Sequence, residues 1–273
     1  MKVTKPNLGQ MAMQVLAYAQ LRNKDIIGTG DISRVLKITR KQEWDLLSRM
    51  EKSGIIVRLK KGSYLVPLRM PAGGRWSPSA YLILTSLMKD INGLYQISGP
   101  NAFNFYGYDE QIPNRFYVYN NKISGDKIIG GFEFVFIKTK MVGSTNPFNT
   151  PDKISVPMAS KARALFDAVY DWSRFNTIPR AYCWIKATLK KNPEFSKELV
   201  DICLLYGNKA TIRRMGYLLS ICGVSPKQYE QLRKKTGSSK GLTGWIPLRP
   251  ARGKIDREWG LIINGEIGDD INS

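Results

Sequence analysis

The sequence predicts an α+β protein of two domains, with residues 1–76 in the first and residues 77–273 in the second. Residues 29–67 carry the signals of two short helices and a basic hairpin. Beyond Ser160, strand-like alternation gives way to the helical period of about 3.6 residues. Between these parts, residues 67–78 are rich in proline and glycine, a composition that breaks regular structure and predicts a linker.

The first domain is expected to begin with two helices. Residues 8–22 place apolar side chains on one stripe, which predicts the first helix. Asp31 is a favourable N-cap, so we expect the second helix to begin there. The buried face of this second helix holds Ile32, Val35 and Leu36.

A third helix follows after a tight turn. Thr39 and Gln42 have the spacing of a capping box, so we expect the helix to begin at Arg40. Gly54 ends it, because glycine adopts the left-handed conformation at little cost. Trp44 is placed at the edge of the core face. The inward face holds Leu46, Leu47 and Met50, and the outward face holds Lys41, Asp45, Ser48 and Lys52.

A basic hairpin completes this domain, with strands at residues 55–59 and 64–67. Helix, turn, helix and hairpin in this order predict a winged helix-turn-helix, whose second helix enters a major groove. Arginine, lysine and glutamine in the first turn of that helix suit phosphate and base-edge contacts. A small helical subdomain with solvated lysines is the alternative. The candidate DNA-binding residues are Arg40, Lys41, Gln42, Asp45, Lys60, Lys61 and Ser63.

The charge of the chain favours a nucleic-acid partner. It has 42 basic and 22 acidic side chains, a net charge of +20 and no histidine. Residues 1–76 alone hold 15 basic and 5 acidic side chains, where the helix-turn-helix interpretation requires positive charge. The 43% apolar fraction indicates a globular protein.

The cysteines and the apolar segments indicate the setting of the protein. Cys183, Cys203 and Cys222 lack metal-ligand spacing, so we expect buried free thiols. The apolar stretch from Tyr81 to Met88 is far shorter than the roughly 20 residues of a membrane span. We therefore expect a cytoplasmic protein in a prokaryote-like setting, with no membrane partner.

The second domain is predicted to place strands before helices. Residues 115–119 and 132–138 alternate as strands of one small sheet. Trp245 and Trp259 are expected to be core anchors of terminal strands that return to this sheet. Helices are expected from residue 79 to about residue 90 and at residues 160–171, 179–191, 194–206, 208–222 and 226–235.

Five passages within residues 8–266 carry a resemblance to a known family. They are the winged helix ending in Lys60-Lys61-Gly62-Ser63-Tyr64, Ile97 to Ala102 running on to Tyr106-Gly107-Tyr108, Ala159 to Tyr170, Gly207-Asn208-Lys209 leading to Arg213, Arg214 and Tyr217, and the stretch GWIPLRPARGKIDREWGLIINGEI. In this order they resemble the antitoxin family of the abortive-infection E (AbiE) systems. These are bacterial phage-defence operons of the type IV toxin–antitoxin class.

This resemblance implies a repressor of its own operon, which binds inverted operator repeats through the winged helix. It also implies that the second domain counters a toxin that resembles a nucleotidyltransferase, without forming a stable complex with it. Tyr106 stands where the family leads us to expect a histidine, so the position is expected to be structural.

The residues argue against an enzyme. Without histidine, catalytic triads based on imidazole are excluded. Gly143 and Ser144 are similar to a nucleotidyltransferase loop, but no Asp-x-Asp pair follows to hold metal ions. A DNA-targeted, metal-dependent nuclease is the first alternative, although Glu133 lacks a lysine on its face. A ligand-responsive regulator is the second, although the sequence shows no convergent polar set for a pocket. We predict no catalytic residue, metal site or cofactor.

Two further clusters of charged residues lie in the predicted helices of the second domain. Asp167 lies in an apolar helix and is expected to be a structural partner of Arg163 rather than a functional acid. The spacing of Lys209, Arg213 and Arg214 predicts one basic face that contacts RNA, DNA or the toxin, with a merely solvated face as the alternative.

Overall fold

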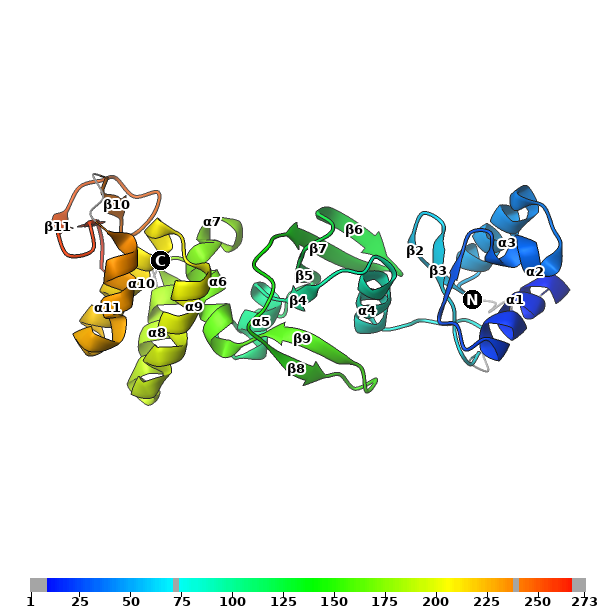
Figure 1. The fold of residues 1–273 in the computed structure, drawn as a ribbon, viewed down its shortest axis with the longest axis horizontal. Helices are drawn as coiled ribbons and strands as arrows, with labels where there is room; N and C mark the ends of the chain where they lie inside the picture. Colours follow the sequence, from blue (N-terminus) through cyan, green and yellow to red (C-terminus); the bar gives the residue numbers. More distant parts are fainter. Residues whose placement is uncertain (1–8, 71–73, 238–240, 267–273) are drawn as a thin grey trace. The chain divides into compact units, whose positions relative to one another are not determined.

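The computed structural model describes residues 9–70, 74–237 and 241–266, and shows an α+β chain (Figure 1). Its elements form two compact units. The first consists of residues 1–95, 114–140 and 147–156, and the second of residues 96–113, 141–146 and 157–273. The domain boundary after residue 76 stays a prediction. Residue 8, the expected start of the first helix, and residues 71–73 of the expected linker lie outside the described residues.

The N-terminal elements have the arrangement of a winged helix-turn-helix. They are α1 (Gln10–Leu21), β1 (Ile26–Gly28), α2 (Asp31–Leu36), α3 (Arg40–Lys52), β2 (Val57–Lys60) and β3 (Ser63–Leu65). The predicted helices and hairpin are confirmed, but Val35, predicted on the buried face of α2, is 44% exposed. Strand β1 was not predicted, because three residues are too few for an alternation pattern. It pairs with β3, so the wing sheet has the antiparallel order β1-β3-β2.

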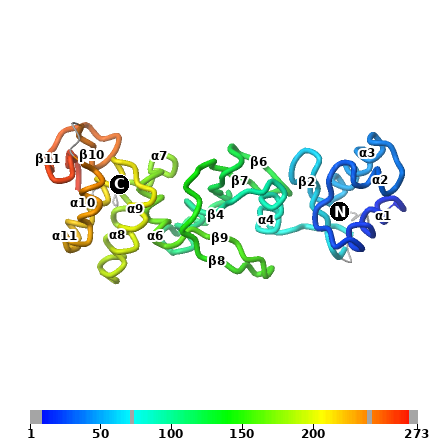
Figure 2. Tube along the Cα trace, in the orientation of Figure 1, coloured from blue at the N-terminus to red at the C-terminus, as the bar shows by residue number. Residues whose placement is uncertain are grey.

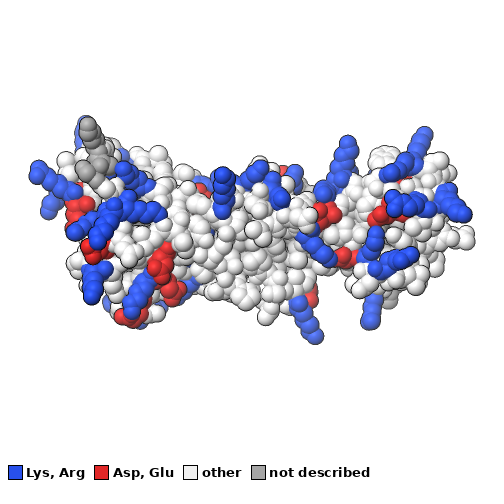
Figure 3. Space-filling model, in the orientation of Figure 1, with Lys and Arg blue, Asp and Glu red and all other residues white. Residues whose placement is uncertain are grey.

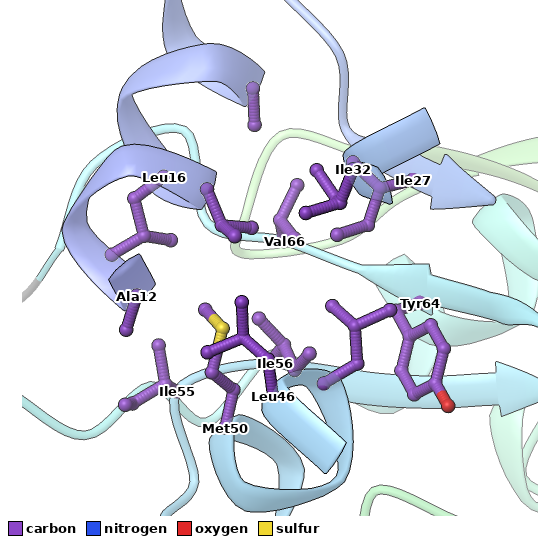
Figure 4. Packing of buried hydrophobic residues seen from close by; sticks show 13 residues of the cluster. Ala12, Leu16, Ile27, Ile32, Leu46, Met50, Ile55, Ile56, Tyr64 and Val66 are labelled. Carbon is purple, nitrogen blue, oxygen red and sulfur yellow. The ribbon is translucent and has the colours of Figure 1, made fainter. Parts of the chain in front are cut away.

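One apolar core holds these elements together. Side chains from both helices of the turn, from α1 and from the wing strands point toward one another (Figure 4). Burying such side chains contributes about 1.5–3 kcal/mol each. The core consists of Ala12, Val15, Leu16, Ala19, Ile27, Ile32, Leu46, Leu47, Met50, Ile55, Ile56, Tyr64 and Val66.

The first unit continues with α4 (Ala80–Asp90), β5 (Arg115–Asn120), β6 (Gly125–Ile129) and β7 (Phe132–Lys138). Strand β5 runs parallel to β7, whereas β6 is antiparallel to it. The predicted α4, β5 and β7 are confirmed. Strand β6 was not predicted, because most of its residues are exposed and show no apolar alternation.

The wing packs against α4 and the turn after β6. Lys60 pairs with Asp90 at 3.0 Å, and Lys89 pairs with Asp25 at 3.3 Å. At Gly130, in the turn after β6, an added Cβ would lie 2.5 Å from Ile83 Cδ1 of α4 and 3.2 Å from Val57 Cγ1 of β2, and the φ of +60 favours glycine. The winged helix and α4 therefore belong to the same compact unit.

The second unit is mainly helical. The predicted helices are confirmed within one or two residues at each end, and Figure 2 follows the trace of the chain through them. Strands β8 and β9 were not predicted, because Pro147 and Pro157 interrupt their alternation. The elements are β4 (Tyr95–Ile97), α5 (Pro100–Phe105), β8 (Thr145–Asn149), β9 (Ser155–Ala159), α6 (Lys161–Tyr170), α7 (Trp172–Phe175), α8 (Arg180–Lys191), η1 (Pro193–Phe195), α9 (Ser196–Tyr206), α10 (Lys209–Ile221) and α11 (Pro226–Thr236), and the division between the units runs through β4, β8 and β9.

The C-terminal strands form a sheet of their own. The strands β10 (Thr243–Gly244), β11 (Lys254–Asp256) and β12 (Leu261–Ile263) have the order β10-β12-β11, so their predicted return to the sheet of β5 and β7 is wrong.

The predicted anchoring role of two tryptophans explains where this sheet packs. Trp245 is buried and stacks on Tyr182 of α8, with ring centroids 3.9 Å apart. Trp259 is buried and lies where a Cβ at Gly216 of α10 would be 2.1 Å from its ring. Both predicted core anchors are therefore confirmed, and they hold the sheet against helices.

A buried ion pair lies inside the second unit. Arg163 Nε donates to Asp167 Oδ1 at 2.7 Å, and neither side chain is exposed. Ser98 donates to Asp167 at 2.6 Å, and Arg163 also donates to the carbonyl of Met141 at 2.8 Å. The structural role predicted for Asp167 is confirmed. Burial raises the pKa of this carboxyl to about 6, although the positive Arg163 opposes that rise.

Tyr106 and Cys203 are placed as the sequence predicts, whereas Cys183 and Cys222 are not. Tyr106 donates its hydroxyl proton to the carbonyl of Ala159 at 2.9 Å, which is a structural contact, as expected. All three cysteines are free, but only Cys203 is buried, and Cys183 and Cys222 are half-buried. In the described part of the chain, every helix is too short or too polar to cross a membrane.

Candidate nucleic-acid interface

The start of α3 is fixed by the capping box that the sequence predicts. The amide of Gln42 donates to Thr39 Oγ1 at 3.2 Å, and the amide of Thr39 donates to Gln42 Oε1 at 2.8 Å. The carboxamide oxygen of Gln42 thus serves the cap. Its amino group is the part of this side chain that can donate to a base edge.

The outer face of α3 carries the candidate contact residues. Arg40 and Lys41 are exposed, and Asp45 is half-buried. Trp44 is 60% exposed and lies on this outer face. Its predicted place at the edge of the core is therefore wrong. The face available to a partner therefore combines two cations with one aromatic ring.

A buried glutamate of α3 holds the two helices of the turn together. The Glu43 carboxylate is 0% exposed and accepts from the amide of Gly30 at 2.8 and 2.9 Å. It also accepts from the amides of Ile32 and Ser33 at 3.0 and 3.1 Å. These groups belong to the N-terminus of α2, where free amides and the helix dipole favour a negative charge.

Sequence reasoning missed this role, because a glutamate in the first turn of a helix usually faces solvent. The predicted N-cap at Asp31 is wrong in consequence. Gly30 occupies the cap position in the left-handed conformation, with φ +99. Asp31 instead accepts from the amide of Gly28 and from Lys24, at 3.2 and 3.3 Å.

Arg40 and the tip of the wing are tied to the same point of the chain. An added Cβ at Gly30 would lie 2.6 Å from the guanidinium of Arg40, so this guanidinium lies over the start of α2. The preceding residue, Thr29, donates its amide to the carbonyl of Gly62 in the wing turn at 2.8 Å. Lys61, next to Gly62, is exposed. The guanidinium of Arg40 and the backbone of the wing turn therefore both lie close to residues 29–30.

The other two wing candidates are placed differently. Lys60 is 44% exposed and paired with Asp90, so its charge is partly engaged within the unit. Ser63 is 3% exposed, and its hydroxyl has no hydrogen-bond partner in the described structure. The burial of this side chain contradicts the prediction that Ser63 contacts DNA.

The exposed cations of this region also include Arg34 of α2, Lys37 after it and Arg58 of β2. On the face drawn in Figure 3, basic side chains project from the region of the N-terminal helices. The strand alternation could have indicated Arg58, since it places this residue and Lys60 on the same side of the wing.

Comparison with known proteins bears on this region. Residues 14–67 match the family described as "Transcriptional regulator, AbiEi antitoxin". The resemblance predicted from the sequence is thus confirmed, and the matched segment runs from α1 to the end of the wing. No curated protein matches the chain.

A solved structure extends the likeness in fold. The structure entitled "Crystal structure of RV2827C protein from Mycobacterium tuberculosis" is similar to this chain with a TM-score of 0.59 and 15% identity. The likeness covers 93% of this chain and 91% of the other. At this identity the likeness concerns the fold, which therefore extends beyond the AbiEi-matched segment.

Outside the AbiEi-matched segment, the second predicted surface is not formed. Arg213 and Arg214 are 5% and 7% exposed, so they do not share a basic face with the exposed Lys209. Arg213 donates to the carbonyl of Gly241 at 2.7 Å, and Arg214 donates to the carbonyl of Gly244 at 3.1 Å. Both guanidiniums instead attach the C-terminal segment to α10, which spacing along one helix does not reveal.

Glu133, the candidate acid of the nuclease alternative, is bound in an ion pair. Glu133 of β7 pairs with Arg115 of β5 at 2.7 Å, and Asp126 of β6 pairs with the same arginine at 3.3 Å. Within the described residues, no three acidic or cysteine side chains gather in a way that could hold a metal ion. No observation thus favours the nuclease alternative.

Proposed function

We propose that this protein is a transcriptional repressor of its own operon and the antitoxin of a type IV toxin–antitoxin pair. The observation that carries the repressor half is the exposure of Arg40 and Lys41 at the start of α3 and of Lys61 in the wing turn. The backbone of that turn is hydrogen-bonded through Gly62 to Thr29, the residue before Gly30. In such a module the helix bearing Arg40 lies in a major groove, and the wing bearing Lys61 contacts the adjoining backbone or minor groove. Arg40 and Lys41 at the start of α3 suit base-edge and phosphate contacts.

The binding half is tested by gel shifts with a fragment of the operon's own promoter and a scrambled fragment of equal length. We expect the promoter to bind at least about tenfold more tightly at physiological salt, because specific binding exceeds non-specific binding by more than this. Equal affinity for both fragments would contradict the repressor role. Inverted operator repeats predict two bound copies with their half-sites about one helical turn apart.

The antitoxin half rests on the match of residues 14–67 to AbiEi regulators and on the resemblance of the whole sequence. The partner proposed is a nucleotidyltransferase-like toxin encoded in the same operon. Expression of that toxin should arrest growth, and co-expression of this chain from an unrelated promoter should restore it. An unrelated promoter separates neutralisation from repression. Persistent growth arrest with abundant, folded antitoxin would contradict this half alone.

A further inference from the structure

A pocket in the second unit combines aromatic rings with cations. It has a volume of about 640 Å³, within the range of small-molecule sites. Its walls come from the turn after α5, the start of α6, and helices α8 and α9 with η1 between them. The side chains that matter for recognition are Tyr108, Lys161, Trp184, Lys191 and Glu198.

The aromatic wall is fixed in place before any ligand arrives. Tyr108 and Trp184 stack with ring centroids 5.7 Å apart and planes inclined by 23°. The hydroxyl of Tyr108 lies 3.3 Å from Thr188 Oγ1, and burial raises the pKa of Tyr108 to about 12, so this phenol stays neutral. Such rings are half-buried, flat and apolar, which suits a planar partner.

The charged side chains that line the pocket do not form ion pairs with one another in the described structure. Lys161 Nζ lies 5.9 Å from the Tyr108 ring centroid and 5.8 Å from that of Phe195. Among the residues that the structure describes, no ion pair joins Lys161, Lys191 or Glu198 to another side chain. Lys161 is also the first residue of α6, whose positive helix end adds to the attraction for an anion.

We propose that this pocket binds a nucleoside monophosphate. A planar ring would lie against the wall of Tyr108 and Trp184, and an anionic group would lie between Lys161 and Lys191. Any aromatic compound that carries an anionic group could make these two contacts. Glu198 selects a nucleotide, because its carboxylate can accept hydrogen bonds from the exocyclic amine of a base or from ribose hydroxyls.

Calorimetric titration of the full chain with AMP, GMP, CMP and UMP tests the proposal. We expect at least one nucleotide to bind, with ribose 5-phosphate, the matching nucleoside and benzoate each at least about tenfold weaker. If all four nucleotides at about 1 mM give no binding heat, the site does not exist. If benzoate binds as tightly as the best nucleotide, the assignment to nucleotides is wrong.

A pair of double variants locates the binding. Lys161→Ala with Lys191→Ala should weaken nucleotide binding by about tenfold or more. Lys186→Ala with Lys190→Ala removes the same charge from exposed positions of α8 outside the pocket and should change binding by less than about twofold. Equal losses in both double variants would mean general charge attraction and would overturn the site. Thermal unfolding of each variant verifies that it is folded.

Discussion

Both carboxylate oxygens of Glu43 in α3 share the single N–H of Gly30, at 2.8 and 2.9 Å, in one bifurcated hydrogen bond that joins α3 to the start of α2. The guanidinium of Arg40 lies over the same glycine.

Replacing Glu43 should therefore destabilise the protein. In Glu43→Gln an amino group replaces one carboxylate oxygen opposite amide donors, and a charge-assisted bond is worth about 1.5–3 kcal/mol. We expect the free energy of unfolding to fall by about that amount in urea titrations. Glu51→Gln removes the same charge from the end of α3 and should cost no more than about 0.5 kcal/mol. Equal stability of the two variants would refute the role given to Glu43.

Arg40 and Lys61 should affect DNA binding in different ways. Arg40→Ala should cost about 1–3 kcal/mol on the operator and relax base preference, because a base-edge contact is lost. Lys61→Ala should weaken binding to all sequences alike and reduce the salt slope by about 1, because a phosphate contact is lost. Fluorescence anisotropy across salt concentrations measures both. Lys52→Ala, exposed at the far end of α3, is the control, and an effect as large as that of Arg40→Ala would refute the assignment.

Ser63→Ala should leave operator affinity unchanged, because Ser63 is buried. Its hydroxyl lacks a hydrogen-bond partner, so removal of this group should leave stability unchanged or raise it by about 1 kcal/mol. Anisotropy and urea unfolding of the same preparation measure the two quantities. A weaker complex with unaltered stability would mean that the hydroxyl reaches DNA after all.

The stability contributed by Asp167 should depend on pH. Its pKa is raised from 3.8 to about 6 in the folded protein, so the folded state holds the proton more tightly than the unfolded state. This contribution is fully present below about pH 4 and is lost as the pH rises through about 6. A pKa shift of this size corresponds to a contribution to the free energy of unfolding on the order of 3 kcal/mol.

The measurement compares wild type with Asp167→Asn at several pH values. The difference in unfolding free energy, wild type minus variant, should decrease between about pH 4 and pH 7. Asp201→Asn, at an exposed position of α9, should show a nearly constant difference. A difference for Asp167→Asn that grows with pH would show that pairing with Arg163 outweighs burial.

Gly216→Ala should destabilise the second unit, because the added methyl would lie 2.1 Å from the ring of Trp259. Overpacking of this kind typically costs about 1–3 kcal/mol. Trp259→Phe shortens the ring system at this point and should lower the cost of the alanine when the two changes are combined. A double-mutant cycle from urea unfolding gives this coupling, and strict additivity would rule out the steric contact.

Where a structural feature depends on residues close together in the chain, the sequence alone predicted it. Thr39 and Gln42 form their capping box across one turn of chain, and Gly54 adopts the left-handed conformation, with φ +71, that ends a helix. The helical periods after Ser160 and the order of helix and hairpin are local patterns as well. For the same reason Arg40, Lys41 and Lys61 could be predicted as exposed cations.

Tertiary structure decided whatever depends on partners distant in sequence. Glu43 is buried because amides 10 to 13 residues away need an acceptor, and Arg213 and Arg214 are buried because carbonyls about 30 residues away do. Ser63 does not belong to the predicted interface because its side chain is buried in the folded wing, which the local sequence does not reveal. A charged or polar side chain has the same local signature whether solvent or a distant backbone group satisfies it, and only the folded chain determines which of the two does so.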